Sequence, residues 1–157
     1  MITRKRSFVV LTLLGILASG KAMAGDEPAV QGEGKTLTYL STLHAKVHRA
    51  WTDNFLAMAA ARLPKDHAVN LATRAVGLNV VLTATGALRG VEVGTFSGSA
   101  EFDSSAMDVV RINAPYVPAP EEALSDDGNV HLEWTFARDD RRCSGLKVKH
   151  VQSPLPE

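Results

Sequence analysis

The sequence predicts an α+β domain of order helix, strand, strand, helix, strand, in which two helices cover one face of a three-stranded antiparallel sheet. Three observations lead to this prediction. Apolar residues recur at helical spacing over residues 37–63. Two segments rich in Val, Leu and Thr flank the pair Thr85-Gly86, and residues 130–138 alternate apolar with polar side chains.

The first predicted helix spans residues 37–63, and Pro64 ends it because proline disfavours helical backbone in the residue before it. Residues 25–36 before it are small and polar, so we expect a flexible leader. The apolar stripe of the helix consists of Leu40, Val47, Trp51, Phe55 and Met58.

A β-hairpin is predicted over residues 76–84 and 88–96, with Gly86 supplying the positive φ of a tight turn. The second helix follows Ser97-Gly98. We expect Asp103 to cap this helix, with Phe102 and Met107 at the hydrophobic staple positions.

A proline corner at Pro115, Pro118 and Pro120 prevents the second helix from continuing, and Asp126-Asp127-Gly128 forms the last turn. Residues 130–138 form the closing strand, with Trp134 on its buried face. Residues 139–157 form a C-terminal tail, in which residues 146–151 are either a short extra strand or an extended segment.

Residues 1–24 have the pattern of a secretory signal peptide, with a basic start, an apolar run and a small-residue site. We expect cleavage after Ala24. The alternative is an uncleaved membrane anchor, but roughly 11 apolar residues give a helix of about 16 Å, about half of a bilayer core.

Removal of residues 1–24 leaves 13 basic and 17 acidic residues, a net charge of −4. Without clustered Lys and Arg, the sequence does not indicate nucleic-acid binding. Cys143 is the single cysteine, which excludes an internal disulfide and leaves this thiol free, buried or joined to a partner chain.

No pattern in the sequence indicates an enzyme, a cofactor or a metal site. His44 and His48 stand four residues apart on the first helix, but no HExxH motif is present and His44 lies on the apolar stripe, so we expect packing or a solvated position. Ser97-Gly98-Ser99 is explained by the turn from strand to helix. Cys143 follows two arginines, but no histidine is placed to activate its thiol.

The ordered set of these elements resembles the C-terminal domain of the TonB and TolA family over roughly residues 39–138. The resemblance implies a periplasmic domain of Gram-negative envelopes that binds outer-membrane or periplasmic proteins, frequently by strand addition, in energy transduction or transport. The segments that carry it are the long helix, the hairpin, Ser97-Gly98, Phe102-Asp103, Ala106, Ala114-Pro115, Pro118, Pro120 and Trp134-Thr135-Phe136.

The family's strand order would place residues 130–138 at the sheet edge, where unpaired backbone groups can accept an extended peptide. We therefore expect partner binding at Val130, His131, Leu132, Glu133, Trp134, Thr135, Phe136, Ala137 and Arg138. Only about ten residues separate the signal peptide from the first helix, which favours a freestanding adaptor over a transducer that spans the periplasm.

Two alternatives stay open. Residues 146–151 would cover this edge, or two copies of the chain would pair there. A structural homo-oligomer of the envelope, joined through edge strands or Cys143, is accordingly the second function class that the sequence allows.

Overall fold

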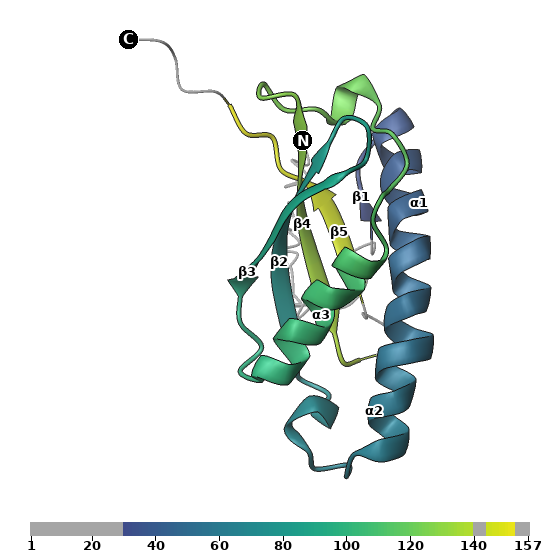
Figure 1. Cartoon of the computed structure of the whole chain (residues 1–157), viewed down its shortest axis with the longest axis vertical. Helices are drawn as coiled ribbons and strands as arrows, with labels where there is room; N and C mark the ends of the chain where they lie inside the picture. The colour runs from purple at the N-terminus through teal and green to yellow at the C-terminus, as the bar shows by residue number, and fades with distance from the viewer. Residues whose placement is uncertain (1–29, 140–143, 153–157) are drawn as a thin grey trace, which may run out of the picture.

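A computed structural model describes residues 30–139 and 144–152 of the chain (Figure 1). The predicted signal peptide, residues 25–29 of the predicted leader and Cys143 lie outside the described residues. Within the described ranges, no helix is both long and apolar enough to cross a membrane.

Five strands form one mixed sheet in the order β1-β5-β4-β2-β3. Strand β2 pairs antiparallel with β3 and β4, β4 pairs antiparallel with β5, and β1 pairs parallel with β5. The strands are β1 (Val30–Gln31), β2 (Ala75–Thr83), β3 (Leu88–Thr95), β4 (Asn129–Ala137) and β5 (Ser144–Val148).

The expected helix-strand-strand-helix-strand order is found in the middle of the chain, but the prediction of a three-stranded antiparallel sheet was wrong. Strand β5 forms because the short segment around Leu146 reaches β4, where the Leu146 side chain is 2% exposed. Part of the predicted leader then pairs beside it as β1, with Val30 opposite Leu146. Both ends of the described chain thus extend the sheet on one side.

The first helical segment comprises α1 (Gly34–Arg49), the π-helical turn η1 (Ala50–Leu56) and α2 (Ala57–Arg62). Most of the predicted stripe is buried, but Met58 is 47% exposed while its neighbour Ala59 is buried. A π-helix has more residues per turn than an α-helix, so the buried face moves along the sequence after η1. The regular period assumed from the sequence does not contain this shift.

The second main helix is α3 (Ala100–Ile112), which starts earlier than predicted. The N-cap is Ser99, whose hydroxyl accepts from the Phe102 N–H at 3.4 Å, so the prediction that Asp103 caps this helix was wrong. The Asp103 carboxylate instead accepts from the backbone N–H of Ser97 at 3.0 Å and fixes the turn that leads out of β3. Phe102 therefore lies inside the helix rather than at the staple position before the cap.

The helices cover one face of the sheet, and the core lies between the two layers (Figure 1). On β2 and β4, buried side chains alternate with half-exposed ones, as expected for a sheet covered on one side. Trp51 stands at the centre, with ring centroids 5.1 Å from both Phe102 and Phe136. Two short 3-10 helices, η2 (Ala68–Asn70) and η3 (Glu121–Ala123), lie in the connections of the described chain.

Candidate functional site

Strand β4 lies in the interior of the sheet, so the prediction that residues 130–138 form an edge was wrong. Its pairing with β2 is continuous from Asn129 to Ala137, and its other side pairs with β5 from Leu132 to Phe136. The physical reason is that β5 occupies the hydrogen-bonding groups that the edge prediction assumed to be free. The alternative that residues 146–151 cover this strand is confirmed for residues 146–148, and the covering strand begins earlier than expected, at Ser144.

The nine residues predicted to bind a partner instead hold the fold together. The four apolar side chains of the expected inner face are at most 1% exposed, namely Val130, Leu132, Trp134 and Phe136. Ala137 is also buried, and the Arg138 guanidinium donates to Asn70 Oδ1 at 3.0 and 3.2 Å. These contacts explain a strong sequence pattern without a ligand.

His131, Glu133 and Thr135 lie on the open face of the sheet, as their alternation with buried residues predicted. Glu133 pairs with Lys147 of β5 at 3.3 Å. His131 Nε2 is 2.9 Å from Asp127 Oδ2. Hydrogen bonds from the Asn129 side chain and from His131 lower the pKa of Asp127 to about 2. These groups stabilise the sheet surface, and they leave β4 closed to strand addition.

The long open edge of the sheet is β3. At the opposite end, β1 contains two residues, whereas β3 has eight and pairs only with β2 among the described strands. Sequence reasoning missed this edge because it took β4 as the last strand of the sheet. The signal that bears on it is the apolar pair Leu146 and Val148 of the further strand beyond β4, and this pair is too short a pattern to identify a strand by itself.

The backbone direction along β3 follows from the hairpin. The Thr83 N–H donates to Ala87 O at 2.9 Å, so the backbone groups of Thr83 point toward β3. The register shifts once between Val81 and Leu82, where the extra residue, Arg89, lies on β3. Strand β2 is therefore regular, its backbone directions alternate, and Val81 and Asn79 also point toward β3. A second hydrogen bond agrees with this assignment. Arg138 N–H donates to Arg74 O at 2.9 Å just before β2, so the even-numbered residues direct their backbone groups toward β4 and the odd-numbered ones toward β3.

The partners of these residues define what β3 offers outward. Val81 pairs with Gly90, and Asn79 pairs with Glu92, so Gly90 and Glu92 direct their N–H and C=O groups toward β2. Val91 lies between Gly90 and Glu92, and Val93 follows Glu92. Both valines therefore direct their N–H and C=O groups away from β2, toward the open edge. Between the two register shifts, the edge thus presents two outward-directed residues that are two positions apart, which is the spacing that an added strand requires.

The side chains along β3 differ between the two faces. Leu88, Val91 and Val93 lie on the helix-covered face, half-buried against the core. Glu92 is exposed on the open face, and Phe96 just beyond the strand is 74% exposed. An extended peptide added here would place alternate side chains beside the valines and beside Glu92.

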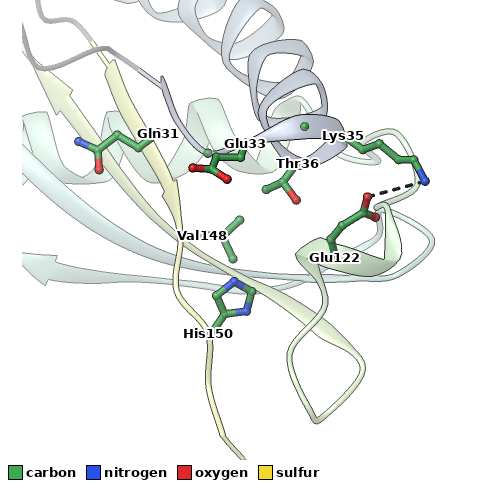
Figure 2. A pocket seen from close by; sticks show the side chains of 9 residues that line it. Gln31, Glu33, Lys35, Thr36, Glu122, Val148 and His150 are labelled. Carbon is green, nitrogen blue, oxygen red and sulfur yellow. Dashed lines mark ion pairs between the residues drawn. The ribbon is translucent and has the colours of Figure 1, made fainter.

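A shallow cavity of about 520 Å³ lies at the start of α1 (Figure 2). Figure 2 shows Glu33, Lys35 and Glu122 around it, with Lys35 paired to Glu122 at 3.7 Å. The segment Gly34-Lys35-Thr36 has the residue types that end a phosphate-binding loop, but only Gly32 and Glu33 separate β1 from α1, which is too short for that loop. Two carboxylates beside the cavity also disfavour an anion.

The described residues contain no group of three or more metal-ligating side chains. His44 and His48 stack on each other with ring centroids 5.1 Å apart. The segment Ser97-Gly98-Ser99 forms the expected turn, in which Gly98 has a φ of 81°.

Comparison with protein-family models, with curated proteins and with solved structures found no match. The resemblance to the C-terminal domain of TonB and TolA therefore stays a prediction from the ordered elements of the sequence, and the open edge at β3 is the strongest candidate for a functional site.

Proposed function

We propose that this protein is a periplasmic interaction module, akin to the TonB and TolA C-terminal domain, that binds an extended segment of an envelope protein by strand addition at β3. The observation that supports the proposal best is the eight-residue β3, which has one neighbouring strand among the described residues and directs the backbone groups of Val91 and Val93 outward. Export to the periplasm follows from the predicted signal peptide, and the proposal involves no cofactor and no catalysis.

The rest of the fold supports a binding role for this edge. Its partner β2 is held on the other side by nine consecutive pairs with β4, so β3 is attached to a rigid support. Helix α3 packs over β3 and fixes its position relative to the core. A preorganised edge loses little conformational entropy when a peptide pairs with it.

The test is a proline at Val91. Because the Val91 N–H points away from β2, the substitution Val91→Pro removes an outward donor and leaves the bonds between β2 and β3 in place. The matched control is Val91→Ala, which removes a similar amount of apolar packing but keeps the N–H. We expect Val91→Pro to abolish capture of the envelope partner, and Val91→Ala to retain it.

Equal capture by both variants, each shown to be folded by circular dichroism, would refute strand addition at this edge. A substitution on the outer surface of α1 should leave capture unchanged. Lys65→Ala, in the exposed loop after α2, provides a second control far along the chain from β3.

The second candidate function is a structural homo-oligomer, because the same open edge can pair with β3 of another copy. Cys143 gives a second route through an intermolecular disulfide. Light scattering at high concentration, with and without reductant, separates these cases. A monomer under both conditions excludes the oligomer. A dimer that dissociates only when reductant is added assigns the contact to Cys143.

A further inference from the structure

We infer that the segment added to β3 carries a basic residue opposite Glu92, between two apolar residues that face Val91 and Val93. This inference rests on the proposed function and specifies the chemistry of the partner. It follows from the distribution of charge across the open face of the sheet, where one row of side chains runs from β3 to β5.

That row consists of Glu92, Asn79, Glu133 and Lys147, which are cross-strand partners in the sheet register. Lys147 neutralises Glu133 at 3.3 Å. Glu92 stands at the other end of the row and is exposed. It forms no ion pair within the described residues. The row therefore ends on an uncompensated carboxylate at the edge where the new strand would pair.

The nearest basic residue on β3 does not compensate Glu92. The Arg89 guanidinium reaches inward over the sheet, where Nη1 donates to Asn129 Oδ1 at 3.4 Å. Strands are about 4.8 Å apart, so the carboxylates of Glu92 and Glu133 lie roughly 10 Å from each other, close to the screening length at physiological salt. A cation beyond Glu92 would thus be attracted to it with little interference from the Glu133 and Lys147 pair.

The geometry of the edge also favours this position. Glu92 directs its backbone groups toward β2, so a residue opposite it in an added antiparallel strand forms a non-hydrogen-bonded pair. Side chains approach most closely in such pairs. The residues on either side hydrogen-bond to Val91 and Val93, and their side chains lie on the helix-covered face beside half-buried valines. The fitting segment is therefore apolar, basic, apolar.

The experiment uses two capped synthetic peptides that alternate valine with threonine and differ only in a central lysine or glutamate. Isothermal titration compares both peptides with the purified protein and with Glu92→Lys. We expect the unmodified protein to bind the lysine peptide about three- to tenfold more tightly, and Glu92→Lys to reverse this preference. Glu33→Lys, which makes the same charge change at the opposite end of the sheet, should keep the original preference.

The outcomes separate this inference from the proposed function. If both peptides bind equally to the unmodified protein and Val91→Pro abolishes both, strand addition stands and the basic specificity is refuted. If neither peptide binds and light scattering shows a dimer that Val91→Pro dissolves, the occupant of the edge is a second copy and both proposals are overturned. A preference that Glu92→Lys leaves unchanged also refutes the role of Glu92.

Discussion

Two fully buried tryptophans differ in one hydrogen bond, and this difference predicts their contributions to stability. The Trp51 indole N–H donates to the Ala137 carbonyl at 3.0 Å, which joins the helical layer to the end of β4. The Trp134 indole N–H has no hydrogen-bond partner in the described part of the chain. Both side chains are 0% exposed, so replacing each by phenylalanine removes a similar apolar volume.

We expect Trp51→Phe to be the more destabilising substitution. Loss of volume costs each variant about 1–2 kcal/mol, and Trp51→Phe additionally leaves the buried Ala137 carbonyl without this donor, which costs about 1–3 kcal/mol. Trp134→Phe removes a buried N–H that has no partner and so avoids this second term. The predicted difference between the free energies of unfolding is therefore about 1–3 kcal/mol.

The assay is urea unfolding followed by far-ultraviolet circular dichroism, because tryptophan fluorescence changes in both variants. A difference of about 2 kcal/mol separates the two midpoints by about 1 M urea. The sharper version places benzothienylalanine at each position, since this analogue keeps the ring size and lacks the N–H. Equal destabilisation at Trp51 and Trp134, or a larger effect at Trp134, would refute the reasoning.

Two further predictions concern turns. Gly86 has a φ of 86°, and a Cβ there would lie 2.2 Å from the Tyr116 carbonyl oxygen, whereas Gly128 has a φ of 74° and open space around it. Gly86→Ala should cost about 3–5 kcal/mol and Gly128→Ala about 1 kcal/mol, measured by thermal unfolding; similar values would contradict this account. The pKa of Asp127 falls from 3.8 to about 2 on folding, so its stabilisation is complete above the unfolded pKa and is lost as pH falls toward 2. Asp127→Asn should weaken the pH dependence of the urea midpoint between pH 4 and 2, and an unchanged dependence would argue against the hydrogen bonds of Asp127 with Asn129 and His131.

Local patterns were sufficient to predict the hairpin, the closing strand and the two helices. Gly86 marked the turn because few other residues adopt its φ, and the alternation around Trp134 identified a strand with one buried face. Each of these signals depends on neighbours within about ten residues. Their predicted bounds therefore agree closely with β2, β3 and β4.

The position of each strand in the sheet could not be predicted in the same way. Strand β5 has five residues, of which only Leu146 and Val148 are apolar, so its own pattern is too short to identify it. Its stability comes from pairing with β4 and β1, which are distant in the sequence. The predicted site failed for this reason, because an edge is a property of the strand order and not of the strand that occupies it.

The most direct measurement of the central claim is amide hydrogen exchange, resolved residue by residue, with and without the lysine peptide. We predict that the Val91 and Val93 amides exchange rapidly in the free protein and become protected when the peptide binds, while the amides of β4 are protected throughout. Slow exchange at Val91 and Val93 in the free protein would contradict an open β3 edge. If the peptide leaves exchange at these two amides unchanged but makes the amides of β5 exchange faster, binding is instead assigned to β4.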